Sequence, residues 1–263
     1  MVEKISDKLK SPYTAAMTGC GFMWKEMTNI LPLLMSPNST ELLRQEIIEN
    51  KYLMMNTEHT RKRAMAEFIK RFNSVPLLFW QEYQQFSPNA QIVAMYYVSL
   101  KCYKLFFDLH LNLVLKRWNS VRQSVTRQDV LMEINEIAST DEFVCGWSDN
   151  TKEKVASSFL SFLRKAGFIK DTASSLTPIH LKDEEFGFYL TLGESWFLEA
   201  CLLQPYEINR IKQNLKIVRT NFIQDNPGPL RIIHNMPRYW FNSKNNSKLL
   251  CTPNHRLQIA DKE

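Results

Sequence analysis

Residues able to support acid–base, nucleophilic or metal chemistry are scattered along this 263-residue sequence. No two of the five histidines have the spacing of a zinc-binding helix. Walker loops, glycine-rich nucleotide fingerprints and serine nucleophile elbows are absent. The acidic run Asp183–Glu185 lacks the strand-borne lysine of a metal-dependent nuclease, which favours a solvated loop. We therefore expect a non-enzymatic protein that uses no metal and no cofactor.

The cysteines and the apolar stretches indicate the compartment. The five cysteines are odd in number and more than 40 residues apart, so we expect reduced thiols rather than disulfides or a zinc site. The first ten residues are too polar for a signal peptide. The most apolar stretch, residues 92–115, is interrupted by charges and fails the test for a membrane span of about 18 residues. These features predict a cytoplasmic protein with no membrane association.

The first candidate for nucleic-acid chemistry is a cationic segment expected to form a helix from Thr57 to Asn73. Its apolar residues recur at the 3.6-residue period and form one stripe, so its cations are expected on the opposite face. With a preceding helix at 41–50, the pair has the length of a helix-turn-helix, whose second helix lies in the DNA major groove. A solvated surface helix explains the pattern equally well. The candidate DNA contacts are Arg61, Lys62, Arg63 and Lys70.

The second candidate lies within residues 126–181. The order of helix, connection, helix, glycine, strand, turn and strand is typical of a winged helix. The second helix is predicted at 149–166, and strands at 168–170 and 176–181 would form a β-hairpin wing. Its expected inward face is Val155, Phe159, Phe162, Leu163 and Ala166. The candidate DNA contacts on this helix are Asn150, Lys152, Lys154, Arg164 and Lys165. We favour DNA contact here over a purely structural winged helix.

Positive charge is concentrated near the C-terminus. Residues 210–256 hold nine Lys or Arg and one acidic residue, whereas the rest of the chain holds 24 basic and 26 acidic residues. Such asymmetry indicates an anionic partner, although a solvated tail would also produce it. Cations and aromatic rings alternate here as they do on nucleic-acid surfaces, although three adjacent rings also suit a core anchor. The candidate contacts are Arg238, Tyr239, Lys244 and Lys248.

These segments require a mainly helical scaffold. An apolar content of 44% with only seven glycines suits a compact protein. Ser87-Pro88 opens a predicted helix of about 30 residues to Trp118, apolar around most of its circumference, as expected for a central helix. The predicted fold is a mainly α bundle around this long central helix, with helix-turn-helix and winged-helix-like elements and a small β-hairpin wing. We expect an N-terminal helical domain (1–120), a winged-helix-like domain (121–192) and C-terminal helices with a basic segment (193–263).

Four segments stand out together by their order and spacing: Tyr13-Thr14 with Thr18–Glu26, Glu49–Phe72, Lys101–Leu109 and Trp147–Ile169. Taken together, they resemble the BrxA family of the BREX bacteriophage-defence systems, and the resemblance spans roughly residues 10–200. It implies a cytoplasmic, mostly helical protein that binds double-stranded DNA without catalysing a reaction. It also implies partners among the other BREX components, which include a methyltransferase, a phosphatase-like protein and ATPases.

We expect weak sequence specificity for duplex DNA, because the candidate contacts are mostly cations suited to phosphates. Two alternatives stay open. An RNA-binding helical module would present the same basic surface but would prefer single strands or A-form shape. A protein-docking scaffold within the defence complex would bind its partners even with the basic helices neutralised.

Overall fold

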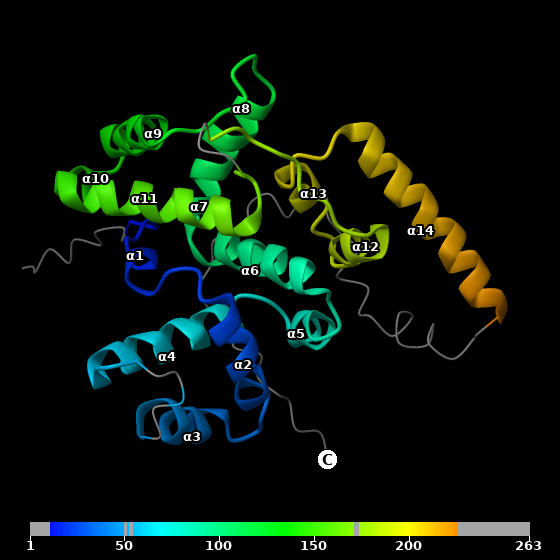
Figure 1. Cartoon of the computed structure of the whole chain (residues 1–263), viewed down its shortest axis with the longest axis horizontal. Coiled ribbons are helices and arrows are strands. Elements are labelled where there is room, and N and C mark those ends of the chain that lie inside the picture. Colours follow the sequence, from blue (N-terminus) through cyan, green and yellow to red (C-terminus); the bar gives the residue numbers. More distant parts are fainter. Residues whose placement is uncertain (1–10, 50–51, 53–54, 171–173, 226–263) are drawn as a thin grey trace, which may run out of the picture.

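The computed structural model describes residues 11–225, except 50–51, 53–54 and 171–173 (Figure 1). Within these ranges the chain is mainly helical and forms no β-strand, which confirms the predicted fold class in its main feature. The helices are α1 (Met17–Cys20), α2 (Trp24–Leu34), α3 (Ser39–Leu43), η1 (Arg44–Glu49, a π-helix), α4 (Glu58–Phe72), α5 (Leu77–Tyr83), α6 (Pro88–Cys102), α7 (Lys104–Leu109), η2 (His110–Leu115, a π-helix), α8 (Lys116–Trp118), α9 (Arg127–Thr140), α10 (Glu142–Cys145), α11 (Asp149–Ala166), α12 (Asp183–Thr191), α13 (Trp196–Ala200) and α14 (Pro205–Asp225).

Side-chain caps set the starts of the best-predicted helices. Thr57 and Ser148 accept hydrogen bonds from the third backbone N–H that follows, and so begin α4 and α11. Thr126 and Asp129 form the capping box of α9 that their spacing predicts. Gly167 ends α11 in the left-handed conformation, at φ 91°. Local sequence therefore fixes where these helices begin and where α11 stops.

The predicted continuous helix from Pro88 to Trp118 is wrong. Tyr103 is extended, at φ −124° and ψ 101°, and it separates α6 from α7. The apolar residues surround this segment, so one straight helix would need partners on every side. The break gives each half its own partners, since α6 packs on α2, α4 and α11 whereas α7 packs on α9. The central position of α6 is nevertheless confirmed, because every residue from Val93 to Leu100 is buried.

The predicted β-hairpin is also wrong as a pair of strands. Only two isolated antiparallel bridges occur in the described part of this region, Ile169 with Leu176 and Ser124 with Ser175. Pairing ends after residue 177 because Pro178 has no N–H and the N–H of Ile179 donates to the carbonyl of Cys201. Three short segments therefore lie side by side, with residues 174–176 in the middle.

The region proposed as a helix-turn-helix departs from that motif. After α3 and η1, residues 50–57 separate η1 from α4, which is longer than the usual turn of about 3–4 residues. The acidic run Asp183–Glu185, predicted as a loop, forms the first turn of α12. Acidic side chains suit that position because they face the positive end of the helix dipole.

Arg71 of α4 anchors the segment between α1 and α2. It is completely buried, and its guanidinium donates to the carbonyls of Gly21 and Phe22, both at 2.7 Å, and to the carboxylate of Glu67 at 3.1 Å. Gly21 lies at φ 66° and ψ −161°, a conformation in which side chains are strained. A buried guanidinium thus neutralises Glu67 and binds a backbone shape that glycine permits.

A single apolar core connects these elements. Its buried side chains come from residues between Met17 and Ile211, on both sides of the predicted domain boundaries after residues 120 and 192. The three-domain division stays a prediction. In Figure 1, α9, α10 and α11 lie on one side of α6, α2–α4 lie on the other, and α14 extends from the edge. Among the described helices, none is long and apolar enough to cross a membrane.

Candidate nucleic-acid interface

Helix α11 separates an apolar inner face from a polar outer face. All five residues of the predicted inward face are buried, so this part of the prediction is confirmed. Lys154, Arg164 and Lys165 are exposed on the helix, and none of the three forms an ion pair with a residue that the structure describes. Arg164 and Lys165 lie in the last turn, where cations stabilise the negative end of the helix dipole. These three cations are free to meet an external anion.

The N-terminal part of α11 is more constrained. Asn150 is exposed in the first turn. Lys152 is only partly exposed, and its Nζ donates to Oδ1 of Asn135 on α9 at 2.9 Å. We therefore place Asn150 with the accessible candidates, whereas Lys152 already holds α9 against α11.

Arg61 does not occupy the solvent-facing position predicted for it. Its side chain is buried, with 6% of the residue exposed, and its Nε and Nη1 donate to the carbonyls of Ile48 and Met55 at 3.0 and 2.8 Å. Ile48 lies in the last turn of η1, and Met55 lies in the connection between η1 and α4, so Arg61 links the two segments. Arg61 is thus part of the structural support of this connection.

The other cations of α4 also make intramolecular contacts. Lys62 is exposed and forms an ion pair with Glu58 at 2.6 Å. Arg63 lies so close to Gly19 that a Cβ at Gly19 would come within 2.0 Å of Nη2. Lys70 places its Nζ 4.3 Å from the centre of the Tyr103 ring. The cations of α4 are therefore less available to DNA than those of α11. The C-terminal candidates Arg238, Tyr239, Lys244 and Lys248 lie outside the described residues.

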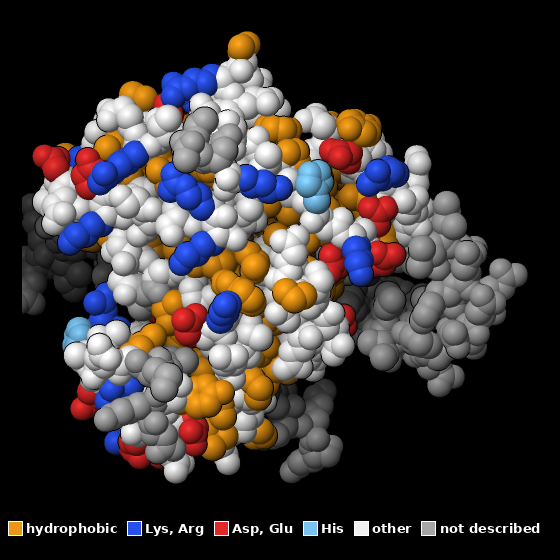
Figure 2. Space-filling view, viewed as in Figure 1, with side chains coloured by type: hydrophobic (Ala, Val, Ile, Leu, Met, Phe, Trp, Pro, Cys, Tyr) orange, Lys and Arg blue, Asp and Glu red, His pale blue; other side chains and the backbone are white. Residues whose placement is uncertain are grey.

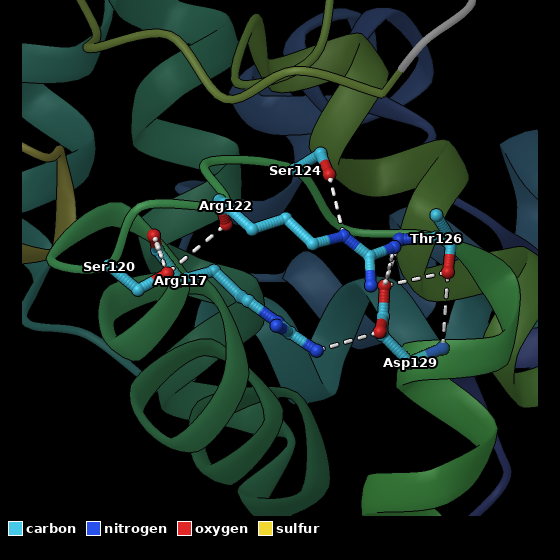
Figure 3. Close-up of polar contacts among 6 residues, drawn as sticks. All are labelled: Arg117, Ser120, Arg122, Ser124, Thr126 and Asp129. Atoms are coloured by element: carbon cyan, nitrogen blue, oxygen red, sulfur yellow. Dashed lines mark hydrogen bonds and ion pairs between the residues drawn. The ribbon is translucent and has the colours of Figure 1, made fainter.

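A cluster that the sequence analysis missed surrounds the start of α9 (Figure 3). Arg117 and Arg122 approach opposite oxygens of the Asp129 carboxylate, at 2.8 and 3.4 Å. Thr126 donates to the same carboxylate through its backbone N–H at 2.8 Å and its hydroxyl at 2.6 Å. Burial of Asp129 disfavours its charge, but the Thr126 hydrogen bonds and the two arginines outweigh that cost and hold its pKa below the usual value.

One feature of the sequence could have predicted this cluster, namely a basic segment without acidic residues. Residues 109–128 contain four Lys or Arg and no acidic residue. The fourth of these cations, Arg127, forms an ion pair with Glu153 of α11, so the start of α9 is fixed to α11.

Lys and Arg side chains lie on the face of the molecule that contains α9 and α11 (Figure 2). Figure 2 shows Lys and Arg side chains spread over the part of the face that contains α9 and α11, and up to the projecting segment beside α8, while acidic side chains gather near its margin. The described residues include no group of three or more His, Cys, Asp or Glu side chains that could hold a metal ion. Chemically, this face is suited to binding a polyanion.

Comparisons with known proteins identify the family. The crystal structure of an uncharacterized protein from Magnetospirillum magneticum shares this fold, with a TM-score of 0.63 and 20% sequence identity over 73% of this chain and 98% of that one. No curated protein matches the chain. The family model BrxA matches residues 11–190, which is more than half of the sequence. The chain therefore belongs to the BrxA family, as its four sequence segments predicted.

Proposed function

We propose that this protein binds duplex DNA through the outer face of α11, without catalysis, as its contribution to phage resistance. Membership of the BrxA family implies a component of a BREX phage-defence system. The observation that carries the DNA proposal is the set of three exposed cations on α11, Lys154, Arg164 and Lys165, none of which forms an ion pair within the described part of the chain. Each cation that meets a phosphate releases counterions, which makes the binding tight at low salt and weak at high salt.

The connectivity around α11 supports its assignment as a recognition helix. The turn at residues 146–148 joins α10 to α11 and includes Gly146, and its length is that of a helix-turn-helix. After α11 the chain forms the Ile169–Leu176 bridge, and the segment before α9 pairs with Ser175. A winged helix has this order, with the strand that precedes its second helix placed beside the last strand of the wing. We interpret residues 124–177 as a winged helix whose sheet is reduced to single bridges.

The test compares two triple variants with equal loss of charge. Lys154→Ala, Arg164→Ala and Lys165→Ala remove the α11 cations, while Lys25→Ala, Arg44→Ala and Lys212→Ala remove exposed cations from α2, η1 and α14. Gel shifts with duplex DNA, single-stranded DNA and RNA at several salt concentrations measure the affinities.

We expect the parent protein to prefer duplex DNA. The α11 variant should bind every duplex more weakly, with a salt slope lower by about 2 to 3, and the control should bind like the parent. Equal losses in the two variants would contradict a specific role for α11. Preference for RNA would support an RNA-binding module instead. Absence of nucleic-acid binding in the parent protein would overturn the proposal and favour a docking scaffold.

A further inference from the structure

The turn between α8 and α9, residues 119–123, projects beyond the body of the fold (Figure 1). Its tip is Val121, which is fully exposed and is the most exposed large apolar side chain that the structure describes. Next to it, the Arg122 side chain is 55% exposed. A single exposed valine is ordinary by itself, but here it lies beside an exposed arginine on a projecting turn, and the pair together is suited to contact a polyanion.

Hydrogen bonds hold this turn in one shape. The Ser120 hydroxyl donates to the carbonyls of Arg117 and Arg122 at 2.9 and 3.2 Å, as Figure 3 shows. The Gln123 side chain donates to the carbonyl of Trp118 at 2.9 Å, and the Gln123 carbonyl accepts from the N–H of Leu176 at 2.8 Å. The turn is therefore ordered before any partner binds, which lowers the entropy cost of binding.

The turn and α11 are connected through the start of α9. Arg122 approaches Asp129, and Arg127 pairs with Glu153 of α11. These contacts fix the position of the turn relative to α11, and so also relative to a duplex bound by α11. The turn is short, and its tip combines a small apolar side chain with an arginine. In the minor groove, proteins place arginines in the negative potential of narrow A·T tracts, and many of them also place apolar side chains in the same groove.

We propose that the turn 119–123 enters the DNA minor groove next to the site of α11, with Arg122 in the groove and Val121 against its walls. This inference rests on the proposed function of α11 and extends it with a second contact and a preference for A·T-rich flanks.

Of the two arginines that contact Asp129, Arg122 is the one that can move away to contact DNA. Its contact with Asp129 is 3.4 Å long, and its Nε donates to the Ser124 hydroxyl at 3.3 Å. Arg117 lies closer to Asp129, at 2.8 Å, and Thr126 donates twice to the same carboxylate. When Arg122 turns toward the groove, Asp129 keeps these three contacts with Arg117 and Thr126, so the start of α9 stays intact.

The experiment uses the full chain and two duplexes that differ only beside a shared centre, one with A·T tracts and one with G·C tracts at the flanks. The variants are Val121→Ser, Arg122→Ala and Arg122→Lys. Leu77→Ser on α5 and Lys212→Ala on α14 are matched controls, because Leu77 is 52% exposed and Lys212 is an exposed cation. Affinity is measured with and without netropsin, a compound that occupies the minor groove of A·T tracts.

We expect the parent protein to bind the A·T-flanked duplex about fivefold more tightly than the other, and netropsin to remove that preference. Arg122→Ala should abolish the preference. Arg122→Lys should keep the salt slope but lose most of the preference, since the more strongly hydrated lysine enters narrow grooves less readily. Val121→Ser should weaken binding to the A·T-flanked duplex, whereas both controls should bind like the parent.

Two results would overturn the inference in different ways. If the parent binds duplex DNA through the α11 cations but has no A·T preference, or keeps that preference in Arg122→Ala, the turn is not a minor-groove contact and the proposed function survives. If the parent binds no duplex at all, both proposals fail together. Thermal melting of each variant shows whether the fold is intact, so that a loss of binding is attributed to the turn.

Discussion

Two buried ionisable side chains show how residue environment sets charge in this fold. Asp129 is ionised and surrounded by donors, whereas His110 at the start of η2 is completely buried in an apolar region. Burial lowers the pKa of His110 from 6.5 to about 4, and its Nδ1 shares a hydrogen bond of 2.7 Å with the Tyr96 hydroxyl. The folded protein therefore holds His110 neutral under conditions in which the unfolded chain would protonate it.

We predict that His110 makes the protein less stable in mild acid. Its pKa is lower in the folded state, so its effect on the free energy of unfolding is complete above pH 6.5 and is lost as the pH falls from 6.5 toward about 4. The total loss should be about 3 kcal/mol. Urea unfolding across this range should show a flatter pH dependence for His110→Gln, and parallel curves for parent and variant would contradict the assignment.

Asp129 should lose its stabilising effect in the same direction of pH as His110, but in a more acidic range. Its pKa is lower in the folded state than the ordinary 3.8, so its stabilising effect is present above that value and is lost only as the pH falls below it. Asp129→Asn removes the charge that Arg117 and Thr126 bind, and we expect a loss of about 1–3 kcal/mol at neutral pH. Gln128→Ala, at an exposed position on the same helix, is the control for urea unfolding and should be close to neutral.

At the scale of elements, the connection before α4 is stabilised by Arg61, a cation that the sequence predicted to contact DNA. Arg61→Ala would leave the carbonyls of Ile48 and Met55 without their donor, so we predict a loss of about 1–3 kcal/mol in the free energy of unfolding. Lys62→Ala removes an exposed ion pair and should change stability by at most about 0.5 kcal/mol. Thermal unfolding distinguishes the two variants, and equal melting temperatures would mean that Arg61 does not support the connection before α4.

The same helix shows what sequence can and cannot predict. The 3.6-residue period and Thr57 predicted the bounds of α4 almost to the residue. The assumption that charges face solvent then misplaced Arg61, although it lies on the buried face with Ala64 and Phe68, at intervals of three and four residues. Whether a guanidinium finds buried carbonyls depends on residues distant in sequence, which periodicity does not encode.

Features set by neighbouring residues were predictable from the sequence, and features set by distant residues were not. The capping box at Thr126 and the Ser148 and Gly167 boundaries of α11 were predictable because each depends on a few neighbouring residues. The break at Tyr103 was not, because no proline or glycine marks it and partners on other helices favour it. The Arg117–Asp129 ion pair joins two helices across a turn, and only the acid-free charge run hinted at it.

At the scale of the whole molecule, positive charge comes from two sources, the face around α11 and the C-terminal residues 226–263. That segment contains six Lys or Arg and two acidic residues. We predict that a chain ending at residue 225 keeps duplex binding through α11 but with lower affinity for all sequences alike and a smaller salt slope, since general phosphate contacts are lost. Gel shifts at several salt concentrations measure both. Complete loss of binding on truncation, with the α11 variant unaffected, would transfer the interface to the C-terminal segment.

The buried guanidinium of Arg71 has a consequence for how this family can evolve. It binds the carbonyl of Gly21, whose backbone shape suits glycine, and it neutralises Glu67. Loss of Arg71 alone would leave a buried carboxylate and two unpaired carbonyls, and a larger residue at position 21 would displace what Arg71 binds. Mutational drift should therefore change positions 21, 67 and 71 in concert, so that in related sequences these three columns covary although about fifty residues separate the first from the last.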